Sequence, residues 1–366
     1  MRGPEGRRRL LRLGASLAVG LAISVALAAL LLRRVDLERV GPEIAAAALW
    51  PLVLALGSKL LGFLGLAWRT RALLRPYREV SLGIGLQGQL LGFAANNIVP
   101  FRMGELVKAD YLARRGGESR SAVLAVAATE RILDVFCLLA LFLLVSPSVL
   151  PRVGLPRAVV LGVGAVAAFA LGAWLIATRA TLWVRVFRVV ERKLGLAEGG
   201  RLSAAAGAFA GGLGAFRLPR ALLSGLLGTA LYWACAFLSV SLCLMAFEIE
   251  APWFSPAVVL VFLAFGTALP ASPGLVGTYH FFFVAALEVF AVEANKAASA
   301  ALTAHALAVV PFTIVGMLLV PGSVGALSSS LRWLVGATPS GAGIGPGEER
   351  LAAHGGTSSD PRSART

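Results

Sequence analysis

The chain has 366 residues, of which 58% are hydrophobic and only 14% are charged. A soluble globular domain carries about 25% charged residues, so this composition excludes an ordinary water-soluble protein. The net charge of +15 does not indicate a nucleic-acid surface, because the basic residues lie in short segments between apolar runs. Several of these runs reach the ~18 residues that can cross a bilayer. We therefore predict an all-α, polytopic integral membrane protein that binds no nucleic acid.

Six apolar segments are predicted to cross the membrane as full helices. Residues 1–12, which precede them, hold five arginines against one glutamate, so we place this basic segment in the cytoplasm. The last residues, 326–366, are rich in Gly, Ser, Pro and charges, which predicts a disordered cytoplasmic tail. Residues 181–196 fit either a basic amphipathic helix or a plain cytoplasmic loop. The six spans cover residues 13–32, 49–67, 121–149, 157–178, 219–247 and 296–320.

Two further apolar segments are interrupted by Pro, Gly and Asn. The connections 68–79 and 101–120 are both basic and are expected in the cytoplasm, and a full crossing by 80–100 would invert every later loop, so a re-entrant segment is the simplest interpretation. We predict that it turns back near Pro100. The same charge counting predicts that 254–292 enters from the outside. Two broken segments that enter from opposite faces are typical of an inverted-repeat transporter.

The first candidate site lies at the turn of the first broken segment. Pro100 lacks an N–H and breaks the helix, and unpaired backbone groups at membrane depth require protein or a water-filled cavity around them. A helix that restarts after the turn offers an N-terminus suited to a phosphate or carboxylate. An ordinary interfacial loop with solvated charges is the alternative. The residues assigned to substrate binding here are Asn97, Pro100, Arg102, Gly104, Glu105 and Lys108.

The second candidate site consists of Glu130, Arg131 and Asp134, which lie about ten residues into an apolar run and hence ~15 Å deep. Charged side chains at that depth are expected to point inward and to pair, so removal of Arg131 should damage folding. Their expected partners are Arg102, Glu105 and Lys108. The resulting neutral network could line a substrate path, or it could be a structural clamp.

The third candidate site is the turn of the second broken segment, where two prolines and two glycines exclude a continuous helix. Nearby His280 and His305 are expected to be hydrogen-bonded structural residues, and Lys59 is expected to line the interior. The substrate-binding residues assigned to this turn are Pro270, Pro273, Gly274 and Gly277.

These motifs resemble those of the lysylphosphatidylglycerol synthase transmembrane family, a flippase-like domain. The resemblance covers about residues 10–325, and we take 13–325 as the domain. The synthases of this family continue into a soluble aminoacyl-transferase domain that is not found here, and the family often has an acidic residue near the position of His280. The matching motifs are Asn97, Pro100-x-Arg102-x-Gly104-Glu105, Glu130-Arg131-x-x-Asp134 and Pro270-x-x-Pro273-Gly274-x-x-Gly277.

The resemblance implies a protein of the cytoplasmic (inner) membrane that moves a lipid between leaflets. Known relatives point to anionic or aminoacylated phospholipids, hopanoids or polyprenyl-linked lipids as partners. No H-E-x-x-H, G-x-S-x-G or Walker motif occurs, so the sequence predicts no metal, no cofactor and no catalytic residue. Two alternatives stay open. One is a membrane-embedded lipid-modifying transferase, with Glu130, Asp134 and His280 as acid–base groups, or the partner of such an enzyme. The other is a small-solute transporter.

Overall fold

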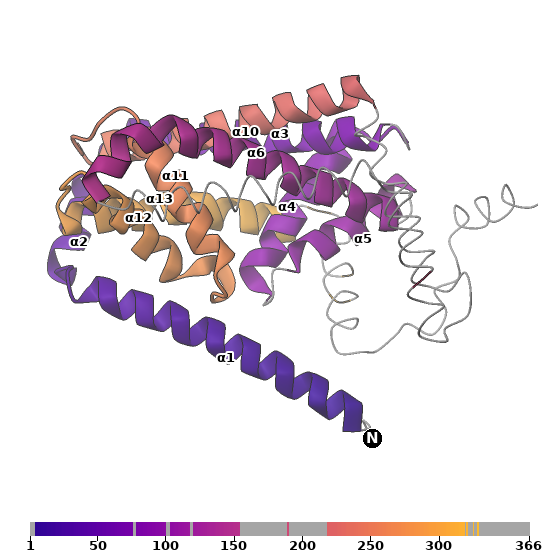
Figure 1. Ribbon diagram of the computed structural model, residues 1–366, viewed down its shortest axis with the longest axis horizontal. Coiled ribbons are helices and arrows are strands. Elements are labelled where there is room, and N and C mark those ends of the chain that lie inside the picture. The colour runs from indigo at the N-terminus through magenta and orange to yellow at the C-terminus, as the bar shows by residue number, and fades with distance from the viewer. Residues whose placement is uncertain are drawn as a thin grey trace, which may run out of the picture.

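The structure is a computed structural model in which every regular element of the described residues is helical, as the sequence predicts. It describes residues 4–75, 78–99, 103–117, 120–153 and 218–318, together with the single positions 189, 320, 325 and 328. The elements in chain order (Figure 1) are α1 (Pro4–Leu32), α2 (Leu37–Ala46), α3 (Leu49–Leu74), α4 (Leu82–Ile98), α5 (Gly104–Gly116), α6 (Arg120–Val153), α10 (Pro219–Ala246), α11 (Ser255–Ala268), the 3₁₀ turn η3 (Pro273–Leu275), α12 (Thr278–Glu288) and α13 (Ala294–Leu318).

Five of the six predicted spans correspond to helices. Within the described residues, α3, α6, α10 and α13 are each long and apolar enough to cross a membrane, and α1 with α2 would add a fifth span if the pair is taken as one. The predicted span 157–178, the segment 181–196 and the tail 326–366 lie outside the described residues, apart from the isolated positions 189 and 328. The protein is thus an all-α, polytopic membrane protein.

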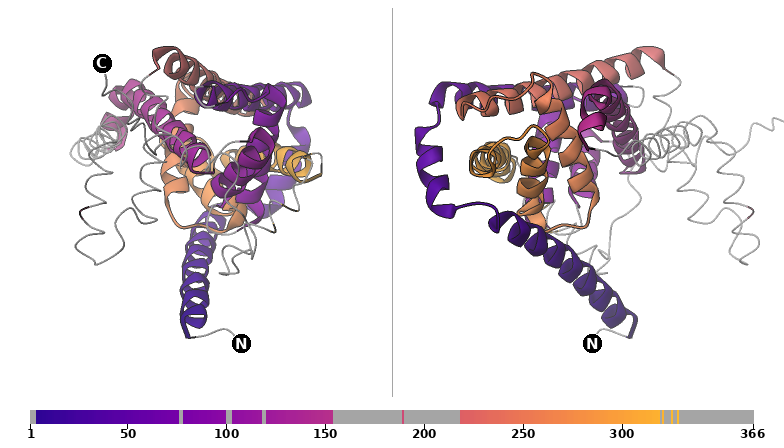
Figure 2. Two further views of the ribbon diagram at one scale, coloured as in Figure 1. Left: turned by 90° about the vertical axis from the view of Figure 1, so that its right-hand side faces the viewer. Right: turned by 60° about the vertical axis from the view of Figure 1, so that its left-hand side comes forward.

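The N-terminal helix leaves the bundle at an oblique angle and packs against α12 (Thr278–Glu288). Figures 1 and 2 show α1 extending obliquely from the bundle, and the chain bends by 83° between its apolar part and α2. The side chain of Asp36 caps α2 by accepting a hydrogen bond from the N–H of Glu38 at 3.1 Å. The N–H of Asp36 donates to Asn295 Oδ1 at 2.8 Å, which fixes this bend against the start of α13.

Helices α3 and α10 pack against each other along their lengths. Glycine makes this close approach possible, because a Cβ on Gly228 would lie 2.8 Å from the carbonyl oxygen of Gly65. Small residues are the usual means by which membrane helices bring their backbones together. At one end of this pair, the N–H of Ala48 donates to the carbonyl oxygen of Ala246 at 2.9 Å.

The first broken segment folds as a helical hairpin of α4 and α5, which we name hairpin 1. Its open end is fixed by Arg78, whose Nη1 donates to the carbonyl oxygen of Gly117 at 3.1 Å. Near its turn, the N–H of Gly104 donates to Asn96 Oδ1 at 2.7 Å. The chain therefore enters and leaves this hairpin at the same end, as the count of basic residues predicts.

The second broken segment forms hairpin 2, made of α11, η3 and α12. At its open end the rings of Phe254 and Phe290 are 5.7 Å apart. At its turn, Gly274 (φ 68°) and Gly277 (φ 85°) adopt the left-handed backbone conformation that favours glycine. Pro273 begins the 3₁₀ turn η3, which contains Gly274.

The two hairpins approach from opposite ends of the bundle, and their turns meet. A Cβ built on Gly274 would lie 3.5 Å from the carbonyl oxygen of Asn97, at the end of α4. The open end of hairpin 1 carries the arginines Arg78, Arg114, Arg115 and Arg120, and we call it the basic end. The open end of hairpin 2 lies with the acidic connection after α10, because Lys296 Nζ donates to the carbonyl oxygen of Glu248 at 3.3 Å. This is the paired arrangement that the sequence predicts.

Cysteine labelling should reveal the orientation of these two ends in a membrane. In a chain whose three native cysteines are replaced, single cysteines at Arg78 and Arg115 should react only with reagent on the cytoplasmic side. Cysteines at Glu250 and Glu293 should react only from the outside. All four side chains are exposed, so slow reaction would not arise from burial. Labelling of the first two positions from opposite sides would contradict the hairpin.

Candidate functional site

A network of charged side chains is centred on Glu130 of α6, whose side chain is 0% exposed. Its Oε2 accepts a hydrogen bond from Lys108 Nζ at 2.6 Å. Its Oε1 accepts a short hydrogen bond from Thr70 Oγ1 and lies 3.6 Å from Arg69 Nε. Gln89 Nε2 donates to Thr70 Oγ1 at 2.6 Å and completes the polar surroundings. Both oxygens of this buried carboxylate are therefore paired, which is the condition for keeping a charge in a low-dielectric interior.

Arg69 is the member of this network that the sequence did not reveal. Its side chain is only 1% exposed, and its Nη1 lies 2.7 Å from Asp134 Oδ1. Nη1 also donates to Thr229 Oγ1 of α10 at 3.4 Å, so this one guanidinium joins α3, α6 and α10. The sequence placed residues 68–79 in a cytoplasmic connection, whereas α3 continues to Leu74. No glycine or proline lies between Gly65 and Pro76, and this allows the helix to continue through Arg69.

Arg131 lies at the rim of the network and not in its buried centre, which corrects the expectation from the sequence. Its side chain is 57% exposed. It forms ion pairs with Glu105 at 2.8 Å and with Asp134 at 3.4 Å. Glu105 is itself partly exposed and also lies 2.8 Å from Lys108 Nζ. The reason is the helical register of α6, because consecutive residues differ by 100° and only one of Glu130 and Arg131 can face the centre.

The predicted pairing of α5 with α6 is thus confirmed for Lys108 with Glu130 and for Glu105 with Arg131, whereas Asp134 pairs with Arg69 and Arg131 and with no residue of α5 in the described part of the chain. Pro100 and Arg102 lie outside the described residues. Within the described part, Arg69 supplies the third cation, so the network has three positive and three negative members. It clamps hairpin 1 onto α3 and α6 and leaves one ion pair, Arg131 with Glu105, accessible. We name the six residues Arg69, Glu105, Lys108, Glu130, Arg131 and Asp134 the charge network.

The turn of hairpin 1 brings two asparagines into different surroundings. Asn96 faces α5 through its hydrogen bond with the N–H of Gly104. Asn97 faces the other way, and its Nδ2 donates to Thr313 Oγ1 of α13 at 2.8 Å. Asn97 therefore connects the charge-network side of the hairpin with the turn of hairpin 2, where its carbonyl oxygen adjoins Gly274.

The turn of hairpin 2 is held by α1, a contact that the sequence did not predict. Ser24 Oγ accepts a hydrogen bond from the N–H of Ser272 at 2.8 Å and shares another with Thr278 Oγ1 at 3.2 Å. Gly277 is buried against the same helix, where an added Cβ would lie 2.5 Å from the carbonyl oxygen of Ser24. The sequence could not predict this contact, because a single serine in an apolar run does not indicate which distant residue it binds. Pro270 is exposed, and Pro273 is half-buried.

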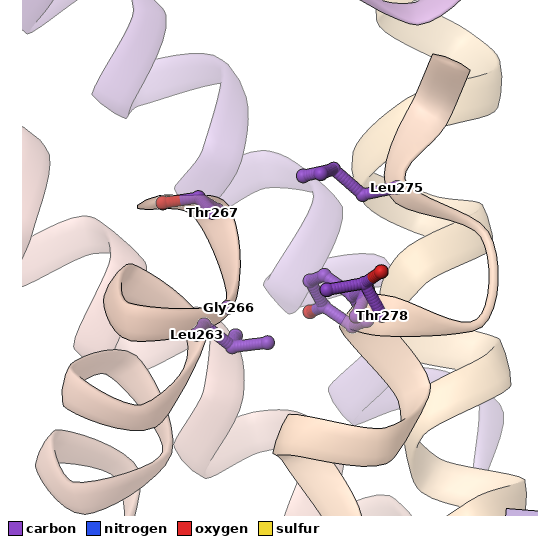
Figure 3. Close-up of a pocket in the computed structure, with 6 residues that line it drawn as sticks. Leu263, Gly266, Thr267, Leu275 and Thr278 are labelled. Carbon is purple, nitrogen blue, oxygen red and sulfur yellow. The ribbon is translucent and has the colours of Figure 1, made fainter. Parts of the chain in front are cut away.

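The arms of hairpin 2 are closely packed. The pocket between them is too narrow to admit a water molecule, and it is mostly apolar. Figure 3 shows the threonines Thr267 and Thr278 on its two walls, one from the end of α11 and one from the start of α12. The predicted site residues therefore form two groups, the charge network and the hairpin 2 turn, which approach each other at Asn97 and Gly274 in a closed arrangement.

Comparison with known proteins identifies the family of this chain. The family model described as the lysylphosphatidylglycerol synthase TM region matches residues 17–316. No curated protein and no solved structure gives a significant match. The matched region includes the charge network and both hairpin turns, and the description names the membrane part of a lipid-modifying synthase. Since most of its length is matched, the chain belongs to the lysylphosphatidylglycerol synthase transmembrane-region family.

Proposed function

We propose that this protein moves a lipid between the leaflets of the cytoplasmic membrane, with both of its termini in the cytoplasm. The observation that supports this function best is the meeting of two hairpin turns from opposite ends of the bundle, at Asn97 and Gly274. Broken helices that meet within a membrane protein are the usual way to build a polar site at the bilayer midplane. The substrate class is an anionic phospholipid, a hopanoid or a polyprenyl-linked lipid.

In this proposal the lipid headgroup follows the polar residues while the acyl chains remain in the bilayer. The accessible pair of Arg131 and Glu105 is the first contact, because a headgroup phosphate competes with Glu105 for the guanidinium. Lys108 lies next to Glu105 and extends this contact toward the buried centre. Since the described arrangement is closed, movement of the headgroup beyond Asn97 requires the two turns to separate.

Reconstitution in liposomes tests the proposal directly. Purified protein is placed in phosphatidylcholine vesicles with a trace of fluorescent phosphatidylglycerol, and dithionite then bleaches the label in the outer leaflet. We expect nearly all of the label to become accessible, whereas empty vesicles protect the inner leaflet. Hopanoid and polyprenyl-phosphate analogues are tested in the same way. If no lipid class moves faster than in empty vesicles, the proposal is wrong.

The variant Arg131→Gln tests whether the accessible ion pair of the charge network contributes to lipid movement. We expect it to fold normally and to slow lipid movement about tenfold, because a charged hydrogen bond contributes roughly 1.5–3 kcal/mol. The matched control is Arg71→Gln on α3, which alters an exposed arginine outside the network. An equal effect of both variants would show that Arg131 acts only through overall charge.

A transferase activity gains no support from the geometry. Glu130 and Asp134 were its proposed acid–base groups, but within the described residues both carboxylates are engaged by Arg69, and Glu130 also by Lys108. A general base must be free to accept a proton from its substrate. A separately encoded transferase that supplies or receives the lipid is compatible with the proposed lipid movement.

A further inference from the structure

The N-terminal helix contacts the rest of the protein along one narrow stripe. Among the described side chains of α1, only Gly20 and Ser24 are buried, whereas α3 has twelve buried residues. Ala28 and Leu31 are half-buried and continue the stripe at helical spacing. Leu21 and other apolar side chains of α1 are exposed. This helix is therefore attached to the bundle by few buried side chains.

The two buried residues of the stripe lie on the turn of hairpin 2. Gly20 opposes Ala271, because a Cβ built on Gly20 would lie 3.1 Å from the carbonyl oxygen of Ala271. The hydroxyl of Ser24 lies 2.8 Å from the N–H of Ser272 and 3.2 Å from Thr278 Oγ1. Both Ser24 and Thr278 are almost fully buried. Helix α1 thus covers this turn and supplies a partner to two of its polar groups.

The other end of α1 is attached to the bundle at the bend that precedes α2. Arg34 Nη1 lies 3.0 Å from Glu288 Oε2 at the end of α12. The N–H of Asp36 binds Asn295 of α13 directly after the 83° bend. Between this attachment and the hairpin turn, a partly open space of about 190 Å³ separates α1 from α12, with Leu31 in its wall. The bend is thus a natural pivot, and the rest of α1 is an arm held mainly at Gly20 and Ser24.

Moving this arm away from hairpin 2 costs little free energy in a bilayer. Lipid tails are as apolar as the side chains that α1 would uncover, so the hydrophobic effect does not hold the helix in place. Hydrogen bonds between membrane helices are individually weak, and Ser24 supplies the two printed for this contact. The turn also borders α4, but α4 has eight buried residues and is held more firmly. Among these neighbours of the turn, α1 is therefore the one that can leave it most easily.

We propose that α1 is a lateral gate, which pivots at the bend before α2 and is latched over the turn of hairpin 2 by Ser24. A lipid whose acyl chains stay in the bilayer needs such a sideways opening, because its headgroup enters from the surrounding lipid. When the gate opens, the N–H of Ser272 and the hydroxyl of Thr278 lose Ser24 and can bind water or a headgroup oxygen instead. The inference rests on the proposed function in taking a lipid as the molecule that passes the gate.

A disulfide that locks the gate tests the proposal. The full chain, with its three native cysteines replaced, carries Ser24→Cys and Thr278→Cys, whose parent oxygen atoms are 3.2 Å apart and thus within reach of a bond. Lipid movement in vesicles is followed by extraction of a short-chain fluorescent phosphatidylglycerol with albumin, because dithionite also reduces disulfides. We expect oxidation to slow the movement at least about tenfold and reduction with dithiothreitol to restore it. Failure of the pair to oxidise would contradict the contact of α1 with hairpin 2 and hence the gate.

The matched control is a disulfide between two helices that the proposal keeps together. A Cβ on Gly62 of α3 would lie 3.4 Å from Cβ of Cys235 on α10, so Gly62→Cys in a chain that retains Cys235 can form this bond. Its oxidation should leave lipid movement within about twofold, because α3 and α10 do not separate in the proposed motion. Equal slowing by both disulfides would overturn the assignment of the gate to α1.

The motion of α1 is also measured without any lipid assay. Nitroxide labels are attached to cysteines at the exposed positions Leu21 of α1 and Phe265 of α11, and their distance is measured in vesicles by double electron–electron resonance. Ser24→Ala should increase the population with the longer distance about three- to tenfold, as expected for the loss of two hydrogen bonds between membrane helices. The control is Ser241→Ala, whose hydroxyl donates within its own helix to the carbonyl oxygen of Phe237. Identical distances in the two variants would overturn the gate.

The two assays separate this inference from the proposed function. Lipid movement that oxidation of the Ser24→Cys, Thr278→Cys pair does not slow would overturn the gate and leave the proposed function in place. Absence of lipid movement in the unaltered chain would overturn the proposed function, and the spin-label distances would then support or overturn the motion of α1 by themselves.

Discussion

Replacing Arg69 with alanine should destabilise the protein by about 3–5 kcal/mol, since it leaves Glu130 and Asp134 without their shared cation. The two carboxylates lie at 3.6 Å and 2.7 Å from nitrogen atoms of Arg69, and its side chain is only 1% exposed. Removing one member of a buried ion pair costs more than the pair itself contributes, because the remaining charge keeps its desolvation penalty. We expect a lower yield of inserted protein and a lower Tm in detergent.

The matched control is Arg71→Ala, two residues further along the same helix. Arg71 is exposed, and the same loss of charge and helix propensity should change stability by no more than about 0.5 kcal/mol. Arg69→Ala combined with Asp134→Asn should recover part of the loss, because one of the two carboxylates that lost the guanidinium of Arg69 is then uncharged. A Tm of Arg69→Ala equal to that of Arg71→Ala would contradict the buried charge network.

The same reasoning separates stability from transport within the network. Arg131 is exposed and pairs at the rim, so its substitution should affect lipid movement more than folding. Arg69 is enclosed by three helices, so its substitution should affect folding first. The sequence predicted the folding role for Arg131 because this residue lies about ten residues into an apolar run, whereas Arg69 was placed in a cytoplasmic connection. The exposure of a charged side chain cannot be read from its position in such a run alone.

Several features of the fold could be predicted because they depend on local composition and charge. Apolar length marks the spans, and the basic residues on both sides of 80–100 require the chain to return to the same end. The pairing of Lys108 with Glu130 follows from the cost of burying either charge alone. These arguments need no knowledge of which helices are neighbours.

The features that escaped prediction depend on distant neighbours and on where a helix ends. Ser24 binds the turn of hairpin 2 across 254 residues of sequence, and Asn97 binds Thr313 across 216. A single polar side chain in an apolar run has many potential partners, and only the packing of α1 and α13 selects one. Arg69 was missed because the end of α3 lies beyond its apolar part, and helix boundaries are the least certain element of sequence interpretation.

Replacing Gly104 with alanine should separate the arms of hairpin 1. An added Cβ would collide with the carbonyl oxygen of Gly92 and lie 2.5 Å from the side chain of Asn96. Both are fixed, since Asn96 Oδ1 accepts a hydrogen bond from the N–H of Gly104 itself. Overpacking of this kind costs typically about 1–3 kcal/mol, and more when backbone must move. Because Glu105 follows directly, we also expect displacement of its ion pair with Arg131 and a strong loss of lipid movement in vesicles.

The matched control is Gly57→Ala on α3, where an added Cβ would meet nothing within 4 Å. Alanine is favoured over glycine inside a helix by roughly 1 kcal/mol, so this variant should be as stable as the unaltered chain or slightly more stable. The contrast isolates packing from helix propensity, because alanine improves propensity at both positions. If Gly104→Ala behaves as Gly57→Ala does in unfolding and in lipid movement, then the close contact of α4 with α5 is not what positions Glu105 against Arg131.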